Sequence, residues 1–170
     1  VLAPTRELAQ QVAEEMNILQ GESGLSIMTV YGGTDLEKQA KGLDAGVDII
    51  VGTPGRVMDM SERGHLDLAS VQVFCLDEAD RMLDMGFIPQ VRRLVRLTPR
   101  SEDRQTLLFS ATFTPEIMRL SQSWTHQPVT IEIDAERVAT DTVEQKIFIS
   151  TADEKFTLLQ NILSGDDVES

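Results

Sequence analysis

Residues 73–82 read VFCLDEADRM and join an apolar strand pattern to a cluster of acids. The β-rich run at 71–77 predicts a strand buried on both faces, and Asp77, Glu78 and Asp80 stand at or just after its end. Neighbouring carboxylates repel one another, and a buried carboxylate is costly unless a cation or a water network neutralises it. The stretch therefore predicts a buried strand whose carboxyl end presents acids to a ligand.

Similar apolar runs alternate with helical patterns along most of the chain. This alternation favours a parallel sheet covered on both faces, so we expect an α/β fold of three layers, α/β/α, with a mostly parallel sheet. The expected strands are 1–3, 25–31, 48–52, 71–77, 105–110 and 129–133, and the expected helices are 6–20, 36–45, 54–63, 81–85, 88–97 and 115–124.

The character of the sequence changes after residue 133. Residues 134–142 are polar and lack a clear period, whereas 143–150 alternate like a strand and 151–163 read as a helix. One strand and one helix cannot form a core alone. We therefore expect a first domain at 1–133, a linker at 134–142, and the start of a second domain at 143–170 with a disordered tail.

Composition and charge narrow the function classes. The net charge of −13 argues against a general polyanion binder, so any contact with nucleic acid must be local and geometric. No apolar run approaches the ~20 residues that span a bilayer, and the single cysteine, Cys75, permits no internal disulfide. With no signal peptide at the start, we expect a cytoplasmic protein without membrane contact.

Two turns at strand ends combine a helix start with an arginine. Thr5 and Thr53 precede expected helices, whose starts favour an anion by ~0.3–1 kcal/mol, and Arg6 and Arg56 lie in the same turns. Because ligands bind at the carboxyl ends of parallel strands, two such turns side by side suit two phosphates of a polynucleotide. Plain helix capping with solvated arginines is the alternative.

The acids suit chemistry on a phosphate. Asp77 would hold hydrated Mg²⁺, which prefers oxygen ligands and keeps several waters, and Glu78 would orient and deprotonate an attacking water. Asp80 could pair with a hydroxyl, and Ser110 and Thr112, just after the neighbouring strand, supply two. The alternatives are an acidic helix start that offsets the helix dipole and an ordinary capping turn at 110–112.

Two further stretches leave their role open. The pair Gly32-Gly33 permits either close approach of the backbone to a ligand or a simple tight turn. The arginine-rich residues 91–100, VRRLVRLTPR, form either a basic contact surface or a solvated helix face.

The order of the motifs PTRELAQQ, GG, TPGR, DEAD and SAT resembles the DEAD-box family of ATP-dependent RNA helicases. The stretches VDIIVGTPGR, DEADRMLDMGF and QTLLFSATF extend the similarity, which covers nearly all of 1–163 and is to bacterial members of the RhlB or RhlE kind. It implies a RecA-like first domain and, at 143–163, the start of a second. It also implies a fragment of an enzyme that couples ATP hydrolysis to unwinding or remodelling of RNA duplexes.

The resemblance also implies roles for individual residues. The RNA-contacting motifs match Pro4, Thr5, Arg6 and Glu7, then Gly33 of the glycine pair, then Thr53, Pro54, Gly55 and Arg56. The acids that handle magnesium, through water, and the attacking water match Asp77 and Glu78. The network that couples hydrolysis to strand separation matches Asp80, Ser110 and Thr112.

The chain also departs from the family. It has no G-x-x-x-x-G-K-[ST] motif, and none of its four lysines follows a glycine. Its start without Met, inside a strand pattern, suggests an N-terminally truncated piece that lacks an upstream segment and most of a second helicase domain. We therefore expect neither ATP nor Mg²⁺ to bind tightly to this chain alone. An open sheet edge could lead to self-association.

Two other functions compete with a helicase fragment. One is a nucleotide-independent module that binds RNA or protein. The other is a receiver-like phospho-acceptor at Asp77, which needs a lysine at a strand end, and no expected strand ends with one.

Overall fold

The structure is a computed structural model that describes residues 1–133 and 147–164. It consists of two compact units, Val1–Val129 and Thr130–Ser170. The first unit contains the strands β1 (Ile27–Val30), β2 (Ile49–Gly52), β3 (Val73–Leu76) and β4 (Gln105–Leu108). Its helices are α1 (Arg6–Gln20), α2 (Leu36–Asp44), α3 (Pro54–Glu62), α4 (Ala79–Asp84), α5 (Ile88–Leu97) and α6 (Pro115–Trp124). The second unit contains α7 (Lys155–Leu163).

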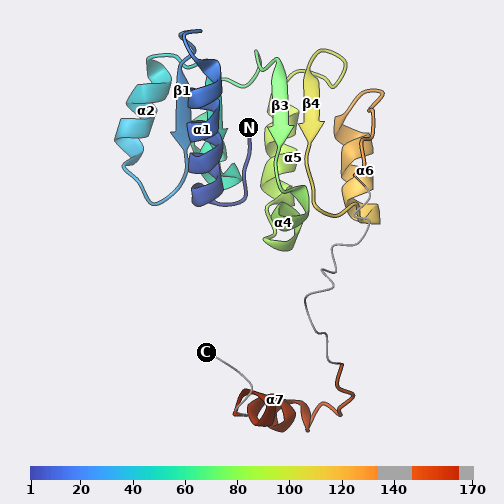
Figure 1. Ribbon diagram of the computed structural model, residues 1–170. Helices are drawn as coiled ribbons and strands as arrows, with labels where there is room; N and C mark the ends of the chain where they lie inside the picture. Colours follow the sequence, from blue (N-terminus) through green and yellow to red (C-terminus); the bar gives the residue numbers. More distant parts are fainter. Residues whose placement is uncertain (134–146, 165–170) are drawn as a thin grey trace. The chain divides into compact units, whose positions relative to one another are not determined.

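Residues 1–3 join two strand pairs into one parallel sheet. β1 pairs with β2 and β3 with β4, both in parallel. Leu2 bridges in parallel to Gly52 and to Leu76, its N–H donating to the Cys75 carbonyl at 2.8 Å. The sheet order is therefore β1, β2, residues 1–3, β3, β4, with the start of the chain between β2 and β3 (Figure 1). This confirms the predicted strand at 1–3.

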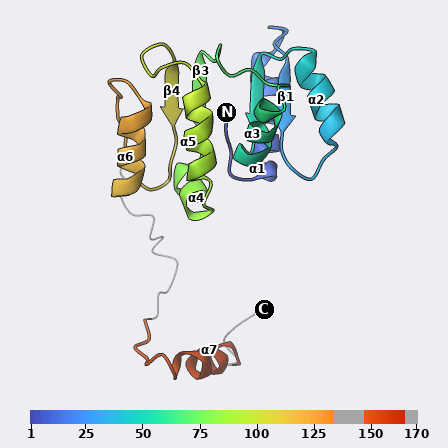
Figure 2. The ribbon, with the colours of Figure 1, turned by 180° about the vertical axis from the view of Figure 1, so that it is seen from behind.

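Helices lie on both faces of this sheet, which gives the expected three layers. In Figure 1, α1 crosses in front of β1 and β2, and Figure 2 shows α3 and α5 in front of the opposite face. The α1 side buries small residues, Ala9 and Ala13, against Tyr31 and Val51. The larger core lies on the other face and includes Leu2, Val30, Val57, Met60, Phe74, Leu76, Met82, Val91, Leu94, Ile117, Leu120 and Trp124.

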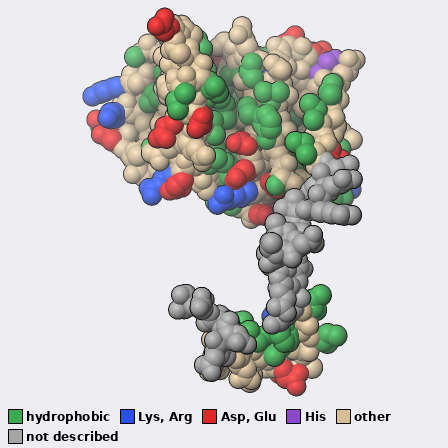
Figure 3. Space-filling view, viewed as in Figure 1, with side chains coloured by type: hydrophobic (Ala, Val, Ile, Leu, Met, Phe, Trp, Pro, Cys, Tyr) green, Lys and Arg blue, Asp and Glu red, His purple; other side chains and the backbone are tan. Residues whose placement is uncertain are grey.

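Beyond α1, the sheet has an apolar face over which none of the described helices of the first unit lies. Cys75 and Leu107 are register partners. Val73 on β3 and Phe109, directly after β4, point to the same face, because side chains two positions apart along a strand share a face. Val73 and Phe109 are exposed, and Figure 3 shows hydrophobic side chains gathered over this part of the molecule. This face therefore differs from the opposite one, where α5 covers the same strands.

The end of the first domain differs from the prediction. Residues 129–133 form no strand, and Val129, Ile131 and Ile133 are all at least 80 % exposed. The reason is that no strand in the described part of the chain pairs with them, and an alternating pattern becomes a strand only when a partner buries one face. The predicted strand at 129–133 is therefore wrong.

The second unit is described only in part. The predicted linker at 134–142 lies outside the described residues, as do residues 143–146 of the predicted strand and most of the tail. Residues 147–150 are not in a strand, which corrects that part of the prediction. The predicted helix at 151–163 begins later, at Lys155, because the N–H and hydroxyl of Thr151 donate to Glu154 Oε2 at 3.2 and 2.7 Å and hold a turn there.

Candidate functional site

The carboxyl ends of the three central strands bring the predicted site residues to one edge of the sheet. β2 ends at Gly52 and β3 at Leu76, with residues 1–3 between them. The Asp77 N–H donates to the Leu2 carbonyl at 3.0 Å, so the acids follow the strand beside the 4–7 turn. The expectation that these motifs share an edge is confirmed.

A concave surface of about 480 Å³ lies at this edge. Predicted RNA-contacting residues form most of its lining, namely Pro4, Thr5, Arg6, Glu7, Thr53, Gly55 and Arg56. The other lining residues are Gly32, Asp59, Met85 and Phe87. Pro54 is buried, and Gly33 directly follows a lining residue. We call this surface the rim groove.

Two arginines reach the glycine turn at 31–34. A Cβ atom on Gly33 would lie 3.7 Å from Arg6 Nη1, so the Arg6 guanidinium passes over this glycine. Gly33 has φ +84°, in the left-handed region that glycine adopts without strain. Arg56 Nη1 reaches the same turn and lies 3.5 Å from the Thr34 carbonyl oxygen. The positive φ of Gly33 therefore accounts for the glycine pair as a turn, and a Cβ on Gly33 would meet Arg6 only at ordinary contact distance.

The two threonine turns differ in their capping. Thr5 Oγ1 accepts a hydrogen bond from the Leu8 N–H at 3.2 Å, as an N-cap does. Thr53 holds the N-cap position of α3 with extended dihedral angles but makes no side-chain capping bond. The first α3 hydrogen bond runs from Val57 to the Thr53 carbonyl, so the N–H groups of Gly55 and Arg56 precede the helix ladder. Plain capping thus accounts for the first turn better than for the second.

Glu78 has an unusual backbone conformation beside Asp77. Its φ of 47° and ψ of 55° lie in the left-handed region, which costs about 1–2 kcal/mol for a residue other than glycine. The Glu78 N–H donates to Asp77 Oδ1 at 3.0 Å, and Glu78 Oε2 accepts from Arg81 Nη1 at 3.1 Å. Such strain is found preferentially where a side chain must point in one functional direction.

Asp80 forms the predicted link with the end of β4. Its Oδ2 accepts from both the N–H and the hydroxyl of Thr112, each at 3.0 Å. Its N–H donates to Ser110 Oγ at 3.3 Å, and Ser110 Oγ in turn donates to the Thr112 carbonyl at 2.8 Å. The capping residue of α6 is Thr114 instead. Ser110 and Thr112 therefore form hydrogen bonds with Asp80 and do not cap α6.

Hydrogen bonds favour the ionised form of Asp80. Partial burial opposes ionisation, but the bonds from Thr112 and from the Arg81 N–H outweigh it and hold the pKa of Asp80 below its ordinary value of 3.8. A carboxylate with a lowered pKa in the folded state stabilises the fold above its ordinary pKa. That contribution is lost as the pH falls through the lowered pKa.

We expect Asp80→Asn to remove this contribution. The gap in unfolding free energy between the wild type and Asp80→Asn should be constant between about pH 5 and 7 and shrink below about pH 4. Urea titrations at a series of pH values measure it. Thr112→Val, which removes one donor and keeps the carboxylate, should show a smaller gap with the same trend. A gap that persists or widens in acid would contradict the bonding described for Asp80.

The acids fit part of a magnesium site. In the described ranges, no group of three or more His, Cys, Asp or Glu side chains is placed to hold a metal ion. The Asp80 carboxylate is already engaged by Thr112, which leaves Asp77 as the carboxylate at the strand end. Mg²⁺ is commonly bound by one or two carboxylates together with waters and substrate phosphates. Asp77 therefore suits magnesium that arrives with a phosphate.

Comparison with known proteins fixes the family. Residues 1–120 match the DEAD/DEAH box helicase family. The chain belongs to this family. It is 50 % identical over 170 residues to "ATP-dependent RNA helicase RhlB" of Pseudomonas aeruginosa, covering 99 % of this chain and 43 % of that protein. It is 44 % identical to "DEAD-box ATP-dependent RNA helicase 52A" of Oryza sativa subsp. japonica, covering 28 % of it.

The fold matches that of a solved DEAD box protein from Methanococcus jannaschii. The TM-score is 0.73 with 39 % sequence identity, over 98 % of this chain and 44 % of the other. The RecA-like α/β/α architecture implied by the motifs is thereby confirmed. The chain spans less than half the length of these relatives.

Sequence reasoning assigned no functional role to three residues of the rim groove, namely Asp59, Met85 and Phe87. Met85 and Phe87 reach it from the α4–α5 connection, where Gly86 has φ +73° and reverses the chain. Asp59 reaches it from α3, where its carboxylate pairs with Arg63 at 2.6 Å. The available signal was the short M-G-F turn that follows the acids. This turn places Met85 and Phe87 at the edge of the sheet that holds the rim groove.

Proposed function

We propose that this chain is part of an ATP-dependent RNA helicase and that its rim groove holds the RNA backbone. The observation that carries the proposal is that the guanidinium groups of Arg6 and Arg56 both reach the glycine turn at 31–34. Guanidinium groups and helix-start N–H groups are the donors that phosphates accept. RNA-contacting roles follow for Pro4, Thr5, Glu7, Gly33, Thr53, Pro54 and Gly55, which line or adjoin the groove.

In the whole helicase, ATP would be the second ligand, and the acids at 77 and 78 would act on it. Asp77 would hold Mg²⁺ through water, and the ion would neutralise charge on the phosphates. Glu78 would accept a proton from the water that attacks the terminal phosphate. Asp80, bonded to Ser110 and Thr112, ties α4 to the end of β4, so a shift of one would move the other. We propose this link as the coupling element.

RNA binding by this chain tests the proposal. In anisotropy titrations with a labelled single-stranded RNA, the double variant Arg6→Gln/Arg56→Gln should bind at least about tenfold more weakly, because two charged hydrogen-bond donors are lost. The slope of log affinity against log salt should fall by about 1.4, for two phosphate contacts.

A matched control removes the same charge elsewhere. Arg92 and Arg96 are exposed on α5, which Figure 2 shows in front of the sheet, and neither of them lines the rim groove. Arg92→Gln/Arg96→Gln should change affinity by less than about twofold, since exposed charges that do not contact the RNA are partly screened by salt. Equal weakening by both pairs would indicate a general charge effect and refute the rim groove as the RNA site.

ATP and Mg²⁺ should bind weakly to this chain alone. Asp77 supplies one carboxylate, and the sequence holds no G-x-x-x-x-G-K-[ST] loop to hold the phosphates. Calorimetric titration with ATP and Mg²⁺ should therefore show no micromolar binding. Micromolar binding would mean that other residues of the chain form a nucleotide site.

The remaining partners are also proposals. In the whole helicase, the chain would work with an upstream phosphate-binding segment and a second RecA-like domain. None of the helices that the structure describes is both long and apolar enough to cross a membrane. A cytoplasmic location and self-association through an open sheet edge, where β1 and β4 are the outer strands, stay predictions.

A further inference from the structure

A buried glutamine of α2 holds the two ends of the glycine turn at 31–34. Gln39 is 7 % exposed, and its Nε2 donates to the Tyr31 carbonyl at 3.0 Å and to Thr34 Oγ1. The Thr34 hydroxyl donates in turn to the Tyr31 carbonyl at 3.1 Å. One side chain therefore joins the first residue of the turn to the last, across Gly32 and Gly33.

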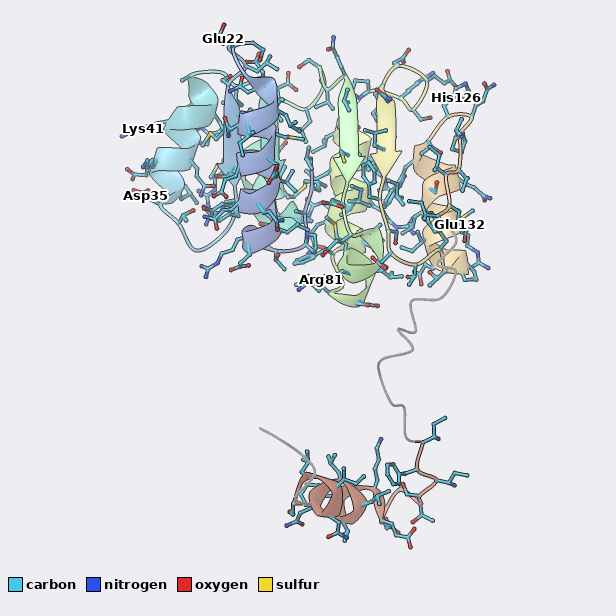
Figure 4. All side chains as sticks on the ribbon, in the orientation of Figure 1. Glu22, Asp35, Lys41, Arg81, His126 and Glu132 are labelled. Atoms are coloured by element: carbon cyan, nitrogen blue, oxygen red, sulfur yellow. The ribbon has the colours of Figure 1, made fainter. Side chains whose placement is uncertain are left out.

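Two helices hold the surroundings of this network in place. Asp35 caps α2 by accepting hydrogen bonds from two backbone N–H groups of its first turn, at 2.9 and 3.2 Å. Figure 4 labels Asp35 at the start of this helix, directly after the turn. From α1, Gln10 Nε2 donates to the Tyr31 hydroxyl at 2.7 Å. Both ends of the turn are thus anchored, and Gln39 supplies the bonds that cross it.

Stability alone does not explain an amide at residue 39. Gln39 Oε1 is buried and accepts no hydrogen bond from the residues that the structure describes. A buried polar atom without a partner opposes folding. The Tyr31 carbonyl would keep a donor in the Thr34 hydroxyl if Gln39 were replaced by an apolar side chain of similar shape. The amide is therefore better explained by what its N–H groups do for the turn.

We propose that Gln39 is a positioning residue that keeps the glycine turn in the conformation that binds RNA. The turn includes Gly32, which lines the rim groove, and Gly33, whose φ is +84°. Glycine is the most permissive residue, so a turn with two of them would sample several conformations without bonds across it. RNA would then have to order the turn, and affinity falls with the fraction of molecules in the competent state. The inference rests on the proposed RNA site.

Gln39→Met tests the role of the amide, because methionine is unbranched like glutamine but has no N–H donor. In anisotropy titrations with the labelled single-stranded RNA, affinity should fall by about fivefold, the result of a competent fraction of about one fifth. The urea midpoint of unfolding should stay equal to that of the wild type or rise, because the buried amide oxygen is removed as well. Since Gln39 is buried, a loss of affinity cannot come from a direct contact with RNA.

The matched control makes the same substitution on another helix. Gln90 of α5 also has a buried amide oxygen with no partner among the described residues, and it does not line the rim groove. Gln90→Met should therefore leave RNA affinity within about twofold of the wild type, as changes away from a site usually do.

Thr34 gives a second test that does not alter the core, because this residue is exposed. Thr34→Val removes the hydroxyl that bonds to Gln39 and should weaken RNA binding, whereas Thr34→Ser keeps the hydroxyl and should restore it. Both residues belong to one network, so Gln39→Met/Thr34→Val should bind no more weakly than the weaker single variant. If Gln39→Met does not fold, the two Thr34 variants decide the question alone.

The outcomes separate the positioning role from the RNA site itself. If Arg6→Gln/Arg56→Gln weakens binding and Gln39→Met does not, the role of Gln39 is wrong although the RNA site stands. Equal binding by Thr34→Val and Thr34→Ser, or losses that multiply in Gln39→Met/Thr34→Val, would also overturn the role. If the arginine pair leaves affinity unchanged, the proposed RNA site fails and the role of Gln39 fails with it.

Discussion

Glu78→Gln should lower the turnover of RNA-stimulated ATP hydrolysis by about 10²–10⁴-fold, the usual contribution of a general base. The assay needs a helicase with all its parts. A suitable one is the Pseudomonas aeruginosa relative with its matching segment replaced by this chain, since the two are 50 % identical over 170 residues. Glutamine keeps the size and the hydrogen-bonding oxygen but cannot accept the proton.

The control for this variant removes an acid that touches no proposed ligand. Asp84 is exposed at the end of α4, and Asp84→Asn should leave turnover within about twofold, as surface changes usually do. Affinity for RNA should be similar in both variants, because neither residue lines the rim groove. Normal turnover in Glu78→Gln would show that another group activates the water.

Gly52→Ala should destabilise the first unit by at least about 3 kcal/mol, the upper range for an overpacked site. A Cβ at residue 52 would overlap the Val30 carbonyl oxygen and lie 2.6 Å from Val57 Cγ2. The backbone cannot move away, because the Gly52 N–H donates to Val1 and its carbonyl accepts from Ala3. Since domains are stable by about 5–15 kcal/mol in total, this loss would be severe.

Urea unfolding of Gly52→Ala against Gly55→Ala measures this directly. A Cβ at Gly55 would meet nothing within 4 Å. In a helix, alanine is favoured over glycine by up to about 1 kcal/mol. Gly55→Ala should therefore be neutral or slightly stabilising. Equal stability of both variants would show that the sheet and α3 do not pack as closely at Gly52 as described.

The sequence was informative about the site because two simple regularities combine there. Parallel strands end at one edge, and the polar motifs follow those strands, so Arg6, Arg56 and Asp77 had to lie near one another. The bonds of Asp80 to Thr112 could be foreseen for the same reason. The roles of these residues came from resemblance, and they stay proposals until the variants above are measured.

Contacts that depend on packing could not be foreseen. Arg104 is 8 % exposed, and it follows the arginine-rich residues 91–100 in a polar stretch that gave no sign of burial. Its guanidinium donates to Thr98 Oγ1 at 2.6 Å and to the Trp124 carbonyl at 3.1 Å. The ends of α5 and α6 thus solvate this cation, helped by the negative ends of their dipoles. This buried arginine site exists only because the ends of α5 and α6 lie next to each other in the fold.

The strand predicted at 129–133 failed for a related reason. Alternation of Val129, Ile131 and Ile133 is a property of the local sequence, whereas a strand needs a neighbour with free backbone groups. The M-G-F turn at 85–87 shows in the sequence that the chain reverses there, but not which surface its side chains reach. Only the structure shows that Met85 and Phe87 line the rim groove.

The most direct test of the account is to map single-stranded RNA onto the ¹⁵N-labelled chain by backbone amide shifts. The account predicts that the shifts concentrate at residues 4–7, 31–34 and 53–56, which meet at the rim groove, and spare the exposed face of α5. Shifts centred on α5, with the three rim segments unchanged, would contradict it.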